Sequence, residues 1–164
     1  MILEGFYGQK VELRENLLYY PHQELWVRPL AEDGELEFGV THAGVILVSG
    51  FTYLEYVVEI GDQLEKGDDI LFVETYKAMI DIEAPISGRI TQINDALKGE
   101  KVSVLESHFY EKPLFAMVPR EPVDLKSLFL DVAAYQEILL RGTSDHCGAG
   151  ARVQRRSKYQ KEES

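Results

Sequence analysis

Residues 72–94 read FVETYKAMIDIEAPISGRITQIN and hold a single lysine, Lys77, with no further basic residue before Arg89. Two short runs flank this lysine, 70–74 before it and 79–83 after it. Both runs are rich in the apolar and β-branched side chains that strands favour. The spacing therefore predicts a tight β-hairpin that carries Lys77 at its tip.

A lysine at the tip of a hairpin projects into solvent, where another protein can reach it. Its amine is a good acceptor for a covalent acyl group, and acylation removes its charge. A side chain that works as a swinging arm needs such a tip on a stiff base, which a hairpin within a closed barrel provides. Most lysines are solvated surface charges, but the strands on both sides favour a functional interpretation of Lys77.

Turn-forming residues are dense on both sides of this hairpin. Short strands between closely spaced turns indicate a small barrel or sandwich, so the predicted fold class is mainly β. The turns lie at Gly61-Asp62, Gly67-Asp68, 84–88 and Asn94-Asp95, and further strands are predicted at 51–60, 89–93 and 114–118.

Other elements flank this region. Apolar-rich runs around residues 32–34 predict a second hairpin. Thr41 can cap a short helix that runs to about Ser49. Residues 124–141 follow a helical period from a cap at Asp124, and we predict one C-terminal helix there.

The chain divides into three parts by composition. Residues 1–18 are mixed in character, and we interpret them as a loosely attached lead-in with a helical turn near 13–18. Residues 19–141 form the predicted domain. Residues 142–164 have almost no apolar content, which is typical of a flexible basic tail.

Charge is unevenly spread along the chain. The formal net charge is −11, and residues 141–164 hold six Lys/Arg against three Asp/Glu. Residues 1–140 therefore hold 11 basic and 25 acidic residues, a net charge of −14. A body this acidic repels phosphate backbones, so we expect no nucleic-acid partner. It suits docking onto basic protein surfaces.

Cys147 is the one cysteine, so no internal disulfide can form, which fits a reducing cytosol. The N-terminus lacks a basic segment followed by an apolar core. The apolar run 43–48, which includes Gly44, is far too short to span a bilayer. We expect a cytoplasmic protein with no secretion signal and no membrane partner.

The stretch 72–94 resembles the lipoyl-attachment segment of the glycine cleavage system H-protein family. That family carries a Glu-Ser-Val-Lys-Ala pattern, then a strand, then Ala-Pro-x-Ser-Gly. Here Glu74 stands three residues before Lys77, and Ala78 follows it directly. Ala84-Pro85 and Ser87-Gly88 match the turn, with Gly88 11 residues after the lysine. The likeness runs from about Leu18 to Leu140.

The resemblance implies a lipoyl/biotinyl-type barrel-sandwich hybrid with flanking strands, a short helix and a C-terminal helix. It implies lipoic acid attached covalently to Lys77, and Glu74 as a recognition residue for the lipoylating enzyme. His42 would lie beside the arm cavity; a local hydrogen bond at the start of the helix is the alternative role for this histidine.

Implied partners fall into two groups. A lipoate ligase, or an octanoyltransferase with a lipoyl synthase, would modify the lysine. Aminomethyltransferase, glycine dehydrogenase and dihydrolipoamide dehydrogenase would use the arm. No Ser-His-Asp, Cys-His or metal-ligand pattern has recognisable spacing. We therefore predict a non-catalytic carrier subunit without a metal, in which the cofactor supplies the chemistry.

Two departures from the family pattern leave alternatives open. Leu25 stands where the family's His-Glu-Trp has glutamate, so a carboxylate for a cationic amine intermediate is missing unless Glu24 supplies it. The loop at 105–114 also differs. A lipoate-binding sulfur carrier beside a heterodisulfide-reductase-like complex is one alternative. A biotin carrier, which has methionine on both sides of its lysine, and an unmodified interaction module are others.

Overall fold

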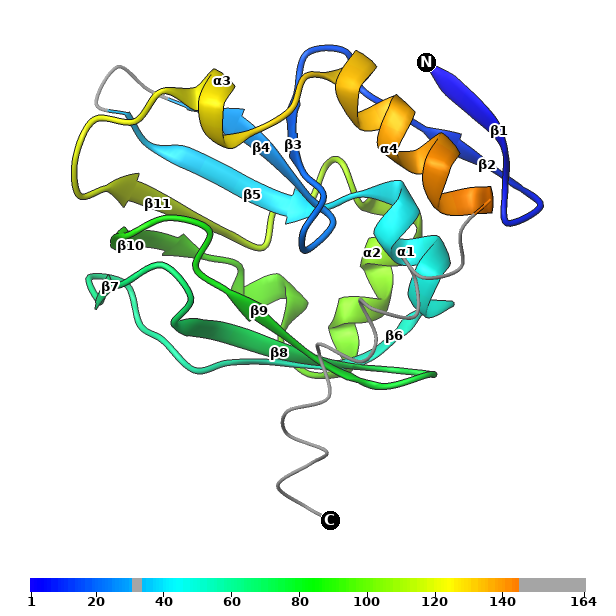
Figure 1. Ribbon diagram of the computed structural model, residues 1–164. Coiled ribbons are helices and arrows are strands. Elements are labelled where there is room, and N and C mark those ends of the chain that lie inside the picture. The colour runs from blue at the N-terminus through cyan, green and yellow to red at the C-terminus, as the bar shows by residue number, and fades with distance from the viewer. Residues whose placement is uncertain (31–33, 145–164) are drawn as a thin grey trace.

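The computed structural model describes residues 1–30 and 34–144. Two β-sheets face each other across a shared core (Figure 1). The larger is antiparallel throughout, in the order β3-β4-β5-β11-β10-β7, and the smaller is antiparallel in the order β6-β8-β9. The mainly β fold class is confirmed. The strands are β3 (Leu18–Tyr20), β4 (Leu25–Pro29), β5 (Leu36–Val40), β6 (Phe51–Tyr56), β7 (Gln63–Leu64), β8 (Asp69–Thr75), β9 (Met79–Glu83), β10 (Gly88–Ile93) and β11 (Phe115–Pro119).

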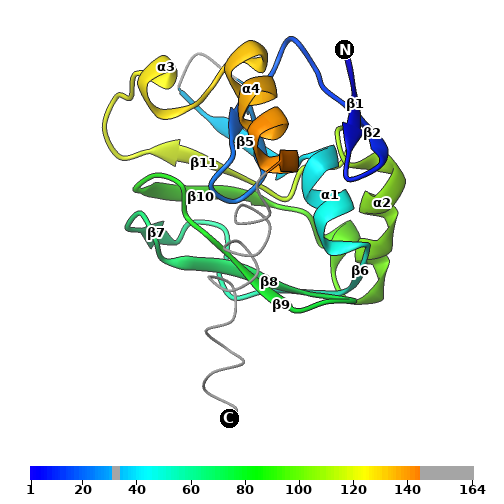
Figure 2. The same cartoon turned by 45° about the vertical axis from the view of Figure 1, so that its right-hand side comes forward.

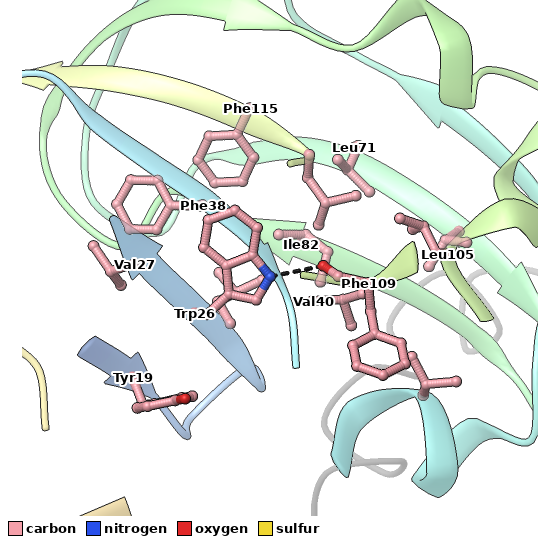
Figure 3. Close-up of a cluster of buried hydrophobic side chains, with 14 of the residues drawn as sticks. Tyr19, Trp26, Val27, Phe38, Val40, Leu71, Ile82, Leu105, Phe109 and Phe115 are labelled. Carbon is pink, nitrogen blue, oxygen red and sulfur yellow. Dashed lines mark hydrogen bonds between the residues drawn. The ribbon is translucent and has the colours of Figure 1, made fainter. Parts of the chain in front are cut away.

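Aromatic side chains fill the larger sheet's side of the core (Figure 3). Phe38 and Phe115 stack with ring centroids 5.0 Å apart. Trp26 is fully buried, and its Nε1 donates a hydrogen bond of 2.8 Å to the carbonyl of Phe109. A buried indole needs such a partner. Gly39 makes room for the ring, since a Cβ there would lie 2.2 Å from Trp26 Cε2.

The predicted short helix is confirmed as α1 (His42–Val48). The Thr41 side chain accepts from the amide of Gly44, and Ser49 ends the helix in the left-handed conformation. The chain between β10 and β11 forms three short helices, which are η1 (Asp95–Leu97), η2 (Glu100–Val104) and α2 (Leu105–His108). In both views, α1 and α2 lie at the same end of the molecule (Figure 2).

A C-terminal helix is present, but the prediction that one continuous helix covers 124–141 was wrong. The segment forms α3 (Leu125–Leu128), capped by Asp124 as predicted, and α4 (Val132–Ser144). The helix breaks because Leu130 exchanges backbone hydrogen bonds of 2.8 and 2.9 Å with Tyr19 at the edge of the larger sheet. Gly142 does not end α4, which runs to Ser144.

The N-terminal segment also differs from the prediction of a lead-in with a helical turn. It forms an antiparallel hairpin of β1 (Ile2–Phe6) and β2 (Gln9–Glu12). Leu3, Phe6 and Val11 are buried in the common core, and α4 packs beside β1. The hydrophobic effect holds this hairpin on the body. The predicted tail, Cys147 included, lies outside the described residues from 145 onward.

None of the described helices has the length and apolar character that crossing a membrane requires. The turn of the predicted hairpin at 32–34 falls largely outside the described residues, but its strands β4 and β5 pair antiparallel as predicted.

Candidate functional site

The β8–β9 hairpin ends in a two-residue tip made of Tyr76 and Lys77. The amide of Thr75 donates to the carbonyl of Ala78 at 2.9 Å, and the Thr75 hydroxyl donates to the same carbonyl at 2.8 Å. Thr75 Oγ1 also accepts from the amides of Lys77 at 3.1 Å and Ala78 at 2.9 Å. Thr75 is buried, so these bonds fix the tip from inside.

Lys77 is exposed at this tip, as predicted. Its Nζ donates to the carbonyl of Leu47, in the last turn of α1, at 3.2 Å. Among residues 1–30 and 34–144, no carboxylate forms an ion pair with it. The neighbouring Tyr76 is 71% exposed and Ala78 is small and buried. The primary amine is thus reachable by a large partner.

Glu74 lies three residues before the lysine on the outer face of the smaller sheet. Its carboxylate accepts a hydrogen bond of 2.8 Å from the Thr52 hydroxyl on β6. The side chain is exposed. This placement leaves the carboxylate accessible to a partner that approaches Lys77, and the recognition role of Glu74 stays a prediction.

His42 and Lys77 lie at opposite ends of α1. His42 is its first residue, whereas Lys77 contacts Leu47 near its last. His42 Nδ1 accepts from the amide of Glu12 at 2.8 Å, and its ring stacks on Phe109 with centroids 4.4 Å apart. Burial lowers the pKa of His42. The bond to β2 gives this histidine a role in anchoring the N-terminal hairpin, and its place beside an arm cavity stays a prediction.

The two residues at the departure from the family pattern both face inward. Leu25 is fully buried on β4. Glu24 is 6% exposed, and its Oε1 accepts from the hydroxyls of Thr41, at 2.8 Å, and Tyr135. Burial raises the pKa of the Tyr135 phenol well above its ordinary value. The Glu24 carboxylate therefore joins α4 to the start of α1 and is not presented at the surface.

Three carboxylates gather on β8 and β9, although no sequence pattern grouped them. Oxygens of Asp69, Asp81 and Glu83 all lie within 4.8 Å of one another, with Asp81 fully buried. Asp69 and Glu83 are register partners in the sheet. Acidic groups often cluster without an ion, and we assign no metal to these three.

The segment 105–114, which differs from the family pattern, forms part of the frame around the tip. Glu106 Oε2 accepts from the amide of Phe51 at 3.1 Å, at the start of β6. The Tyr110 hydroxyl donates to the carbonyl of Glu12 at 2.7 Å, and the carbonyl of Phe109 accepts a hydrogen bond from Trp26 Nε1. This segment thus ties β6, β2 and β4 together beside α1.

Sequence reasoning missed the role of Thr75. The signal was a hydroxyl residue two positions before the lysine, because Ser and Thr side chains commonly accept from backbone amides in tight turns. The contacts of the tip with α1 carried no comparable signal, since they join residues about 30 positions apart.

Comparisons with known proteins agree with this geometry. The glycine cleavage H-protein family model matches residues 18–141. A glycine cleavage system H protein of Photorhabdus laumondii is 35% identical over 122 residues, which are 74% of this chain and 92% of the relative. One from Nitrosospira multiformis is 35% identical over 124 residues, 76% of this chain and 93% of the relative.

A solved structure shares the fold. It is the crystal structure of a glycine cleavage system H protein from Mycobacterium marinum, with a TM-score of 0.64 and 21% identity over 77% of this chain and 98% of that one. The family model covers most of the chain, and the matched relatives are covered almost completely. The chain therefore belongs to the glycine cleavage H-protein family.

Proposed function

We propose that this protein is the lipoyl carrier of a glycine cleavage system, with lipoic acid joined by an amide to Lys77. The observation that carries the proposal is the exposed primary amine at the tip of a hairpin braced by Thr75. Membership of the H-protein family supports it.

The residues at the tip fit this cofactor. An acyl acceptor must be an amine that a modifying enzyme can reach, and Lys77 is exposed without an ion pair among the described residues. Ala78 beside it is small, and the Tyr76 side chain is largely exposed to solvent. When bound, lipoic acid supplies a dithiolane that carries the aminomethyl group.

The chain's own residues contribute position and docking. The hairpin keeps the point of attachment in one place relative to the body. Tethering raises the effective concentration of the arm at each docked active site. The acidic body would face basic surfaces of aminomethyltransferase, glycine dehydrogenase and dihydrolipoamide dehydrogenase. The lipoylating enzyme would recognise Glu74. The protein itself would contribute no catalytic group.

The alternatives gain no support from the comparisons. The relatives described above are named for glycine cleavage, and none is named for sulfur transfer or biotin. Tyr76 and Ala78 beside the lysine also differ from the two methionines of biotin carriers.

Reconstitution tests the proposal. The lipoylated protein is mixed with aminomethyltransferase and glycine dehydrogenase, and release of CO₂ from glycine is measured. The wild type and Lys66→Arg, an exposed lysine at another turn, are expected to support the reaction. Lys77→Arg should not, because arginine cannot be acylated by the same chemistry. Full activity of Lys77→Arg, or none of the lipoylated wild type, would overturn the proposal.

A further inference from the structure

The tip of the β8–β9 hairpin lies against the C-terminal end of α1 and near α2 in both views (Figures 1 and 2). The last carbonyls of a helix have no partner within it and carry a partial negative charge. The amide of Ser49 bonds to the carbonyls of Val45 and Ile46, and α1 has no basic residue in its last turn. The Leu47 carbonyl takes the Lys77 ammonium instead, at 3.2 Å.

Gly50, just beyond α1, meets the other residue of the tip. A Cβ on Gly50 would lie 2.9 Å from Tyr76 Cε2, 3.1 Å from Tyr76 Cδ2 and 3.1 Å from Glu106 Oε2. The edge of the tyrosine ring therefore rests on the glycine backbone. Gly50 also has a φ of +123°, which other residues rarely adopt.

We propose that the C-terminal end of α1, from Leu47 to Gly50, is a seat that holds Tyr76 and the unmodified Lys77 in one presentation for the lipoylating enzyme. The inference rests on the proposed function, since it concerns the same lysine. The Leu47 carbonyl holds the ammonium, and Gly50 accommodates the ring. Because Tyr76 is 71% exposed, the contact buries little surface and serves to set the direction of the tip.

Acylation would release the lysine from the seat. The ammonium first gives one proton to solvent or to a base of the modifying enzyme, and the free amine attacks an activated acyl donor, a mixed anhydride or thioester. The N–C bond forms as the bond between the acyl carbon and the leaving group breaks; the leaving group departs with that electron pair, and the second proton passes from the nitrogen to the leaving group or to solvent. Nζ passes from three protons and a positive charge to one proton and none. Its attraction to the negative end of α1 is then largely lost. The seat would thus hold the substrate lysine and free the finished arm.

A matched pair of glycine variants separates the seat from simple backbone strain. Gly50→Ala places a methyl group against Tyr76. Gly61→Ala has similar strain, with a φ of +100°, but nothing lies within 4 Å of its Cβ. The initial rate of lipoylation is measured with a lipoate ligase, ATP and lipoate, and unfolding is followed in parallel. We expect Gly50→Ala to slow modification about tenfold and Gly61→Ala to change the rate less than about twofold.

A double-mutant cycle identifies the ring as the cause. In a Tyr76→Ala background, the methyl group at position 50 has no ring to displace. Gly50→Ala should then slow modification clearly less than it does in the wild-type background, because only the backbone strain and the contact with Glu106 Oε2 remain. Equal slowing by Gly50→Ala in both backgrounds, or equal rates for Gly50→Ala and Gly61→Ala, would overturn the seat.

A measurement on the unmodified protein tests the contact between the Lys77 ammonium and the Leu47 carbonyl. Backbone order parameters of residues 76 and 77 are compared in the wild type, Lys77→Arg and Lys77→Gln. We expect about 0.85 in the first two and a smaller value in Lys77→Gln, which lacks the charge although Thr75 still braces the tip. Equal values in all three would contradict the seat. This measurement needs no lipoylation, so it tests the seat independently of the proposed function. Failure of the wild type to become lipoylated would count against the proposed function instead.

Discussion

Thr75 and Ala78 close the hairpin tip through two hydrogen bonds to one carbonyl, from the Thr75 amide at 2.9 Å and from its hydroxyl at 2.8 Å. The same hydroxyl oxygen accepts from two amides of the tip. One buried side chain therefore sets the backbone on which Lys77 stands.

Thr75→Val should loosen this tip, because valine keeps the shape of threonine and leaves the amides of Lys77 and Ala78 without their acceptor. Lost hydrogen bonds of this kind cost about 1 to 3 kcal/mol. In urea denaturation, the free energy of unfolding should fall by an amount in that range. Lipoylation of Lys77 should also become slower. Thr75→Ser keeps the hydroxyl and should restore the modification rate; equal rates for Thr75→Val and Thr75→Ser would disprove the role of Thr75.

The glycines at 39 and 142 should respond in opposite directions to alanine. A Cβ at Gly39 would lie 2.2 Å from the buried Trp26 ring, so Gly39→Ala should lower the free energy of unfolding by about 3 kcal/mol. Nothing lies within 4 Å of a Cβ at Gly142, inside α4. Gly142→Ala should therefore raise it by about 0.5 to 1 kcal/mol. Thermal and urea unfolding measure both, and a stabilising Gly39→Ala would contradict the packing of Trp26.

The N-terminal hairpin should loosen at acid pH through His42. Burial lowers the pKa of His42 in the folded protein, and its Nδ1 must be unprotonated to accept from Glu12. The stability that neutral His42 contributes is present above its unfolded pKa of about 6.5 and is lost as the pH falls through the lower folded value.

His42→Gln provides the comparison, since glutamine offers an acceptor and does not titrate. Between pH 8 and pH 5, the wild type should lose more free energy of unfolding than this variant. The protection factor of the Glu12 amide in hydrogen exchange, which is corrected for the intrinsic effect of pH, should fall over the same range in the wild type alone. Parallel pH profiles for the two proteins would rule out this histidine as the cause.

Tyr135 should hold α4 through its hydroxyl. Tyr135 is fully buried, stacks on Tyr19 with ring centroids 4.3 Å apart and donates to the buried Glu24 carboxylate. Tyr135→Phe keeps the ring and removes that donor, which should cost about 1 to 3 kcal/mol. Tyr53→Phe, at an exposed tyrosine, is the control and should change stability by less than about 0.5 kcal/mol. Similar losses for both variants would argue against the Glu24 network.

The central part of the fold could be predicted because its signals are local. The strands on both sides of Lys77 and the cap at Thr41 depend on neighbouring residues, and both appear in the structure. The break between α3 and α4 depends instead on Leu130 pairing with Tyr19, which lies far away along the chain. No helical period within the segment could show that pairing.

The N-terminal hairpin was missed for a similar reason. Its strands are short, and its turn includes Tyr7 with a φ of 50° and Gly8 with a φ of 79°. Its burial depends on α1 and α4, which contact it from distant parts of the chain. At the site, Lys77 was identifiable because it is a lone cation between strands, whereas the inward direction of Glu24 depends on tertiary packing.

Peptide mapping by mass spectrometry tests the central claim most directly. The protein is purified from its native host, grown with lipoate, and each lysine is examined for added mass. We predict one addition of about 188 Da, the size of a lipoyl amide, at Lys77 and at no other lysine. An unmodified Lys77, or the same addition on a different lysine, would contradict the account of this hairpin as the attachment point of the arm.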